Sequence, residues 1–108
     1  MTDLYLRAES WAAEDPDPVT AAALRDLVAS ARAGNPEAAE ELADSFAGNL
    51  EFGTAGLRAA LGPGPNRMNR VVVQRAAAGL ARWLVARGHV GAKVLIGYDA
   101  RHNSDVFA

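Results

Sequence analysis

The sequence predicts an α/β fold in its second half, preceded by a helical segment in its first half. Residues 1–49 place apolar side chains at helical spacing between prolines and glycines that break helices. After residue 50 the order is glycine-rich loop, amphipathic helix, continuous apolar run, turn and helix start, which is the order of an α/β domain. We therefore predict a helical N-terminal extension over residues 1–49 and the incomplete beginning of an α/β domain over 50–108.

Capping signals divide the first half into three helices. The first is predicted over residues 3–13, and "DPDP" at 15–18 ends it because proline disfavours the helical conformation in the residue before it. The next two each begin with a capping residue followed by proline, whose missing N–H costs nothing at the first helical position. The predicted caps are Asp17 and Asn35, and the predicted stops are Gly34 and Gly48.

The second half alternates predicted strands and helices. Residues 50–52 are expected to form a short strand, and Asn69 is expected to cap a helix over 70–87 that Gly88 closes. "AKVLIGYD" at 92–99 is an apolar run typical of a strand buried on both faces of a parallel sheet. Asn103 or Ser104 then begins another helix. Because that helix has hardly started at Ala108, we expect the chain to be a piece of a longer protein.

Composition excludes several classes of function. A net charge of −2 and a pI near 5.6 argue against nucleic-acid or anionic-membrane partners bound through bulk charge. No apolar run approaches the roughly 20 residues of a membrane helix. The chain has no cysteine, which excludes disulfides and thiolate metal sites and agrees with a cytoplasmic location.

The first candidate site is "FGTAGLR" at 52–58. Gly53 and Gly56 permit positive φ and a close approach of backbone to a ligand, so exposed N–H groups there could form an anion-binding nest. Thr54 adds a hydroxyl, and Arg58 adds a planar donor fork suited to phosphate. The alternative from composition is a glycine-rich connection that carries a solvated arginine.

Two further segments carry polar groups. "LGPGPNRMNR" at 61–70 is predicted to be a mobile surface loop ahead of a capped helix, the alternative being a basic loop that leads an anion to the helix N-terminus. "GYDARHNS" at 97–104 follows the carboxyl end of the predicted strand, where ligands bind in open α/β sheets. There an Asp99–Arg101 pair can brace the turn, line a site, or do both.

Together, "FGTAGLR…MN" and "GYDARHNS…FA" resemble the N-terminal part of the α-D-phosphohexomutase superfamily. The resemblance is closest to its phosphoglucomutase-2 and phosphopentomutase-like branch and covers about residues 40–108. It implies a three-layer α/β domain I. It also implies an enzyme that moves phosphoryl between the 1- and 6-positions of a hexose, or the 1- and 5-positions of a pentose. A phosphoserine, Mg²⁺ and a sugar bisphosphate intermediate take part in that reaction.

The resemblance also assigns residues. It places Arg58 in the catalytic centre, with Gly53, Thr54 and Gly56 lining the same phosphate-binding place. The match to "GYDxR" implies that Asp99 and Arg101 support that centre.

The family's phosphoserine motif and Mg²⁺ loop do not occur in these residues. We therefore expect a longer parent mutase that acts on a phosphosugar and binds Mg²⁺ and a sugar bisphosphate activator outside this chain. We expect the isolated chain to be inactive and to self-associate through its exposed apolar surface. The alternative is a non-catalytic helical interaction module that keeps a vestigial sugar-phosphate loop.

Overall fold

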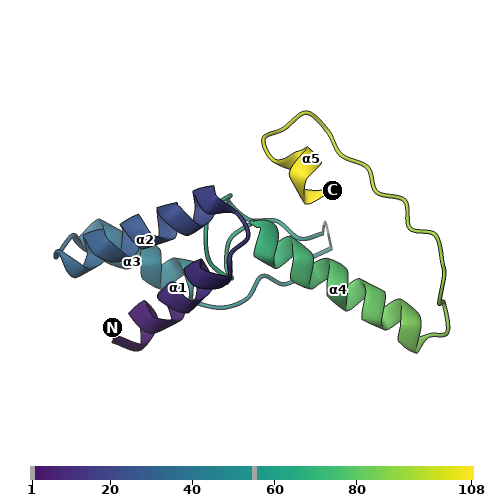
Figure 1. Cartoon of the computed structure of the whole chain (residues 1–108), viewed down its shortest axis with the longest axis horizontal. Helices are drawn as coiled ribbons and strands as arrows, with labels where there is room; N and C mark the ends of the chain where they lie inside the picture. The colour runs from purple at the N-terminus through teal and green to yellow at the C-terminus, as the bar shows by residue number, and fades with distance from the viewer. Residues whose placement is uncertain (1, 55) are drawn as a thin grey trace. The chain divides into compact units, whose positions relative to one another are not determined.

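The computed structural model describes residues 2–54 and 56–108, in which the regular structure is helical (Figure 1). The chain divides into two compact units, Met1–Val72 and Val73–Ala108, each of which is described by itself. The predicted domain boundary at residues 49 and 50 stays a prediction, and the glycine-rich segment after it belongs to the first unit. The helices are α1 (Thr2–Glu14), α2 (Pro18–Arg32), α3 (Pro36–Ser45), α4 (Arg70–Ala86) and α5 (Ser104–Phe107).

The predicted starts of α2 and α3 are confirmed. The Asp17 carboxylate accepts the Val19 N–H at 2.9 Å, and the Asn35 amide oxygen accepts the N–H groups of Glu37 and Ala38 at 3.0 and 3.3 Å. Each bond satisfies a backbone donor that has no partner inside the helix. The sequence determines these starts because the cap and the donors lie within three residues of one another.

The two predicted stops have different outcomes. Gly34 ends α2 as predicted: it has φ +97°, it donates to Ala31 O, and Asn35 donates to Ser30 O. The prediction for Gly48 is wrong, because α3 already ends at Ser45. Gly48 does not adopt positive φ, and the carbonyls at the end of α3 are bonded by residues far along the chain, as described below.

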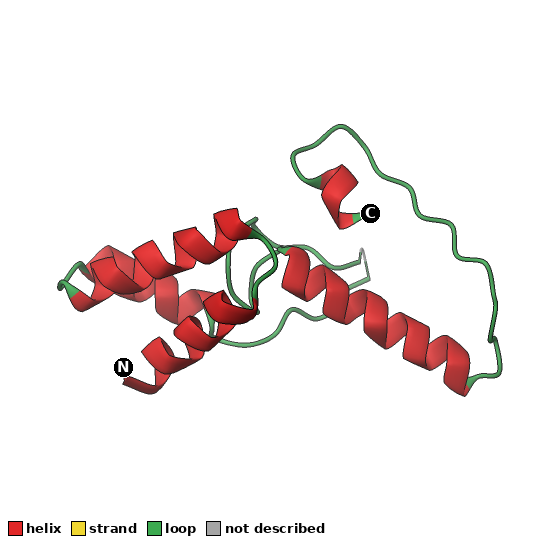
Figure 2. Ribbon diagram, in the orientation of Figure 1, coloured by secondary structure: helices red, strands yellow, loops and turns green. Residues whose placement is uncertain are grey.

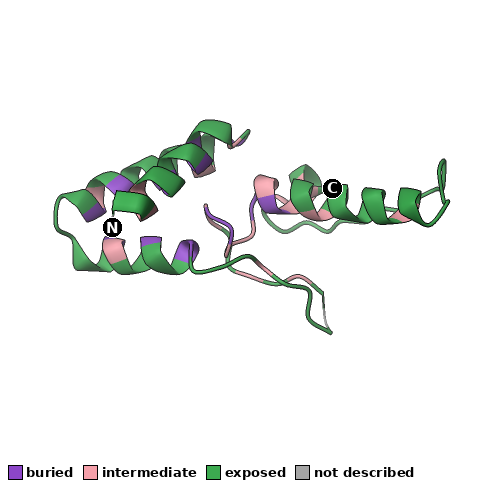
Figure 3. Cartoon of the chain, turned by 90° about the horizontal axis from the view of Figure 1, so that it is seen from below, coloured by how far each residue is buried: buried purple, intermediate pink, exposed green. Residues whose placement is uncertain are grey.

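The core of the first unit lies between α1, α2 and α3, where Figure 3 shows the buried residues on facing sides of the helices. Leu24 and Leu42 are fully buried, and Trp11 meets Phe46 edge to face with ring centroids 5.9 Å apart. Leu50 and Leu57 of the glycine-rich segment pack against this core. The helical extension and the segment after it therefore share one core. Its buried members are Ala8, Trp11, Ala12, Leu24, Val28, Ala31, Ala38, Leu42, Phe46 and Val72.

Helix α4 begins and closes as predicted. Val72 N–H donates to the Asn69 side-chain oxygen at 3.0 Å, and Gly88, with φ +81°, donates to Val85 O at the other end. Val72 is the buried residue of α4, whereas Leu80 and Trp83 are about half exposed. The apolar stripe that the sequence predicts for this helix consists of Val73, Ala76, Ala77, Leu80 and Leu84. Ala77 and Leu80 are exposed, and the other three residues are partly buried.

The predicted strands at 50–52 and 92–99 are wrong for this structure. Within the described residues, regular pairing is limited to two isolated bridges, Gly53 with Gly56 and Leu61 with Met68. Figure 2 shows loop between α4 and α5, and Leu95 in this loop is 98% exposed. A strand needs a second strand to pair its N–H and C=O groups, and no other described segment pairs with 92–99. The sheet of an α/β fold is thus not formed here.

No helix in the described part of the chain is long and apolar enough to cross a membrane.

Candidate functional site

The glycine turn, which begins at Gly53 and ends at Gly56, is closed by a pair of backbone hydrogen bonds between these two residues. Gly53 N–H donates to Gly56 O and Gly56 N–H donates to Gly53 O, both at 3.1 Å. Gly56 has φ +99°, a conformation that glycine adopts without strain. The N–H groups of both glycines are used in these bonds to carbonyl oxygens, so these two groups are not free donors of the predicted nest. The remaining polar group identified there is the Thr54 hydroxyl, on an exposed residue.

Arg58 follows this turn and is exposed. Its neighbour Leu57 packs against the helical core, which fixes the backbone on one side of the arginine. Arg58 makes no hydrogen bond or ion pair with any other residue that the structure describes. Its guanidinium therefore presents its donor fork to solvent, as a phosphate-binding arginine requires before its ligand arrives.

Both ends of the segment that carries the turn and Arg58 are held by residues 65–68. At its start, Leu50 N–H donates to Pro65 O at 3.1 Å. At its end, Met68 N–H donates to Ala60 O at 2.8 Å. The described residues between Leu50 and Ala60 thus belong to a loop that backbone hydrogen bonds close at its base.

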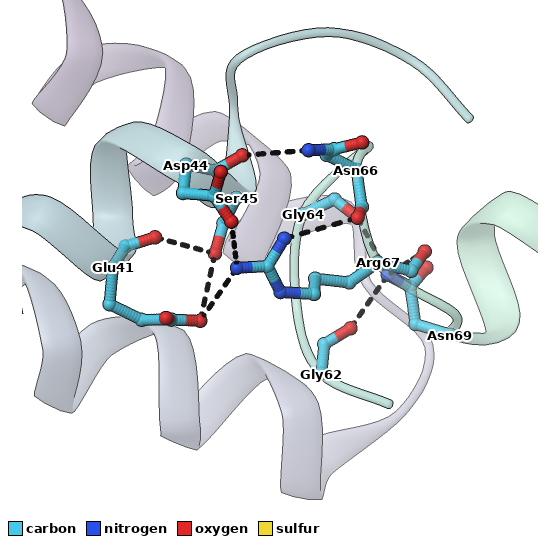
Figure 4. A network of polar contacts seen from close by, with 8 residues as sticks. All are labelled: Glu41, Asp44, Ser45, Gly62, Gly64, Asn66, Arg67 and Asn69. Carbon is cyan, nitrogen blue, oxygen red and sulfur yellow. Dashed lines mark hydrogen bonds and ion pairs between the residues drawn. The ribbon is translucent and has the colours of Figure 1, made fainter. Parts of the chain in front are cut away.

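The docked segment, residues 62–69, contradicts the prediction of a mobile surface loop. Asn69 at its end is 1% exposed, and its side-chain amide donates to Gly62 O and Gly64 O, both at 2.8 Å (Figure 4). Gly64 and Pro65 are buried. The sequence identified Asn69 as a helix cap but not as the residue that fixes this segment, because the donors and acceptors that it joins are brought together only by the fold.

In the second unit, the turn predicted at 97–104 is braced by Asp99. The carboxylate of Asp99 accepts hydrogen bonds from the Arg101 backbone N–H at 3.1 Å, from Arg101 Nε at 2.8 Å and from Ser104 Oγ at 2.7 Å. The Ser104 hydroxyl, followed by the Arg101 N–H, holds the pKa of Asp99 below its ordinary value. The predicted Asp99–Arg101 pair is confirmed, and Asn103 precedes α5 at φ 66° without a side-chain capping bond.

The predicted site residues thus fall into two groups. Gly53, Thr54, Gly56 and Arg58 belong to the first unit, and Asp99 and Arg101 belong to the second. That the two groups meet in one centre stays a prediction.

A metal site is not formed in the part of the chain that the structure describes. No group of three or more histidine, aspartate or glutamate side chains there could hold a metal ion. The residues present therefore do not fit the Mg²⁺ that the resemblance implies.

Comparison with known proteins relates this chain to phosphosugar mutases. A protein-family model described as "Phosphoglucomutase/phosphomannomutase, alpha/beta/alpha domain I" matches residues 49–108. A phosphoglucomutase of Staphylococcus aureus (strain bovine RF122 / ET3-1) is 43% identical over 68 residues, covering 63% of this chain and 12% of that protein. A phosphopentomutase of Homo sapiens is 39% identical over 93 residues, covering 84% of this chain and 14% of that protein. The chain thus spans about an eighth of these relatives' length. No solved structure matches it.

Proposed function

Because the chain belongs to the phosphoglucomutase/phosphomannomutase family, we propose that it is the N-terminal part of a longer phosphosugar mutase and contributes residues to the active site. The reaction is the transfer of phosphoryl between the 1- and 6-positions of a hexose phosphate, or the 1- and 5-positions of a pentose phosphate. The names of the relatives, phosphoglucomutase and phosphopentomutase, support both sugar classes.

The observation that carries this proposal is an exposed arginine on a loop whose base is fixed. Arg58 stands between the glycine turn and the backbone bond of Ala60 to Met68. Phosphoryl transfer depends on positioning and on stabilising the charge of the transferring group. In the proposed role, the Arg58 fork binds phosphate oxygens, and the exposed Thr54 adds a hydroxyl. Gly53 and Gly56 shape the turn.

The rest of the chemistry is assigned to the longer protein. The phosphoserine and Mg²⁺ that the resemblance implies would come from outside these 108 residues. The isolated chain is accordingly proposed to be inactive. In the longer, cytoplasmic protein, residues 50–108 would form the beginning of a three-layer α/β domain I in which Asp99 and Arg101 support the centre.

The test is a coupled mutase assay on the longer protein with glucose 1-phosphate, mannose 1-phosphate and ribose 1-phosphate. Arg58→Ala is expected to lower turnover about 10²–10³-fold, the cost of losing one donor to the transition state. The matched control is Arg82→Ala, which removes an exposed arginine from α4 and should leave turnover unchanged. Absence of activity on all three sugars, or near wild-type turnover in Arg58→Ala, would contradict the proposal.

A further inference from the structure

The C-terminal end of α3 is capped by a segment some twenty residues later in the chain. The last carbonyls of a helix lack partners inside it. Here Asn66 N–H donates to Ser45 O at 3.1 Å, and Asn66 Nδ2 donates to Asp44 O at 3.0 Å (Figure 4). Ser45 O at the end of α3 therefore gains a partner from the docked segment, and Asp44 O, which also accepts the Ala47 N–H at 3.2 Å, gains a second partner.

Arg67 adds an ionic contact at the same place. One of its terminal nitrogens, Nη2, contacts Glu41 Oε1 at 2.9 Å and Asp44 Oδ2 at 2.5 Å, and its side chain is only 11% exposed. Burial would lower the pKa of Arg67, but hydrogen bonds to Asp44 and Glu41 outweigh it and raise the pKa above its ordinary value. A positive charge at a helix C-terminus is also favoured by the helix dipole. Arg67 thus ties the docked segment to α3.

Asn69 ties the same segment to α4. Its amide nitrogen donates to Gly62 O and Gly64 O, while its oxygen accepts the Val72 N–H in the first turn of α4. Because the side chain is fully buried, each of these groups would lose a partner without regaining water if Asn69 were removed.

Two backbone hydrogen bonds connect the docked segment, which Arg67 and Asn69 hold, to the loop that carries Arg58. Pro65 and Met68 lie on the docked segment, and they bond Leu50 and Ala60 at the two ends of the loop that carries Arg58. We propose that Arg67 and Asn69 are positioning residues of the mutase reaction: Arg67 fixes the docked segment to the end of α3, Asn69 fixes it to the backbone N–H of Val72, and the docked segment fixes the loop from which Arg58 binds phosphate. This inference rests on the proposed function.

The first test measures kcat and KM of the longer protein for Arg67→Gln and Arg67→Lys. Misplacing a catalytic group by about 1 Å can cost 10²-fold, so kcat of Arg67→Gln should fall about 10- to 100-fold. Arg67→Lys keeps a cation at the end of α3 and should recover part of this loss. The matched control, Arg32→Gln, breaks an exposed 2.7 Å ion pair with Glu9 and should leave kcat unchanged.

The second test separates positioning from a general loss of stability. Amide hydrogen exchange of Leu50 and Met68 should accelerate at least about tenfold in Arg67→Gln, while that of Val28 in α2 stays as in the wild type. Asn69→Asp is a second variant. It keeps an oxygen for the Val72 N–H but replaces the donor to Gly62 and Gly64 with a carboxylate, so it should loosen the same amides.

The outcomes discriminate between the two proposals. If the wild type is active and Arg58→Ala is impaired, but Arg67→Gln keeps its kcat or keeps its slow exchange at Leu50 and Met68, the positioning role is overturned and the proposed function stands. If Arg58→Ala is as active as the wild type, or the wild type has no mutase activity, the proposed function fails and this inference fails with it. If Arg67→Gln does not fold, Arg67→Lys decides by the same readouts.

Discussion

Replacing Gly64 with alanine should destabilise the first unit by displacing the docked segment from α3. Gly64 has φ +106°, which costs an L-residue about 1–2 kcal/mol. A Cβ there would lie 2.6 Å from Ser45 O and 3.0 Å from Ser45 Cβ, and relieving such an overlap costs about 1–3 kcal/mol. Weakening a hydrogen bond in the docked segment adds about 0.5–1.5 kcal/mol. Alanine also lowers the conformational entropy of the unfolded chain, which offsets about 0.4–1 kcal/mol of this destabilisation.

The expected loss in the free energy of unfolding is therefore about 2–6 kcal/mol, a large part of the roughly 5–15 kcal/mol of a typical domain. The assay is urea unfolding of the chain followed by the fluorescence of Trp11, which is 8% exposed in the core. Trp83, which is 52% exposed and lies in the other unit, is replaced by phenylalanine in every variant so that Trp11 alone reports.

Two glycines provide matched controls. Gly34 has a similar φ of +97° but no atom within 4 Å of an added Cβ, so Gly34→Ala measures the backbone cost alone, about 1 kcal/mol. Gly48 has neither positive φ nor a close atom, so Gly48→Ala should be neutral or stabilise by up to about 1 kcal/mol. If the losses in the free energy of unfolding of Gly64→Ala and Gly34→Ala agree within about 0.5 kcal/mol, the overlap with Ser45 has no measurable cost and the reasoning is refuted.

Three further predictions use the same chain. Asn35→Ala should lower the free energy of unfolding by about 1 kcal/mol because the side-chain cap of α3 is lost, whereas Asn35→Asp keeps a capping oxygen and should keep the stability. Equal free energies of unfolding for the two variants would contradict the capping role. Leu42→Ala should lower the free energy of unfolding by about 2–5 kcal/mol because Leu42 is fully buried. Leu6→Ala, at an exposed position, should lower it by about 0.5 kcal/mol or less. The Asp99 pKa is lowered, so the braced turn is fully present above about pH 5 and should be lost as the pH falls through that lowered pKa. In an NMR titration the Arg101 and Ser104 amides should shift with a midpoint below the ordinary value of about 3.9, and a midpoint at or above it would contradict the bracing.

The helix starts could be predicted because their causes are local. Asp17, Asn35 and Asn69 each bond an N–H two or three residues further on, so residue type and spacing suffice. Gly34 and Gly88 were equally predictable as stops, since each adopts the positive φ that glycine allows. The Asp99 brace, which spans five residues, belongs to the same class.

The candidate site residues stay a prediction, whereas the hydrogen bonds that support their loop could not be predicted from the sequence. The motif identified Arg58, and the structure describes it as exposed on a closed loop. The pairing of Gly53 with Gly56 removed two of the predicted free donors, because the N–H of each glycine donates to the carbonyl oxygen of the other when the turn closes. Whether Asp99 and Arg101 join Arg58 stays a prediction from the family resemblance.

By itself, the sequence determined the helix starts and the membership of a phosphosugar mutase family, and it identified Arg58 as a candidate site residue. Tertiary structure decided where α3 ends, and it decided that residues 62–69 are held in place. The contacts responsible join Asn66 to Asp44 and Arg67 to Glu41, which are 22 and 26 residues apart, a separation that no local pattern records. The same reason explains the failed strands. An apolar run such as 92–99 specifies only the tendency to extend, and a sheet requires a partner strand brought to it by the fold.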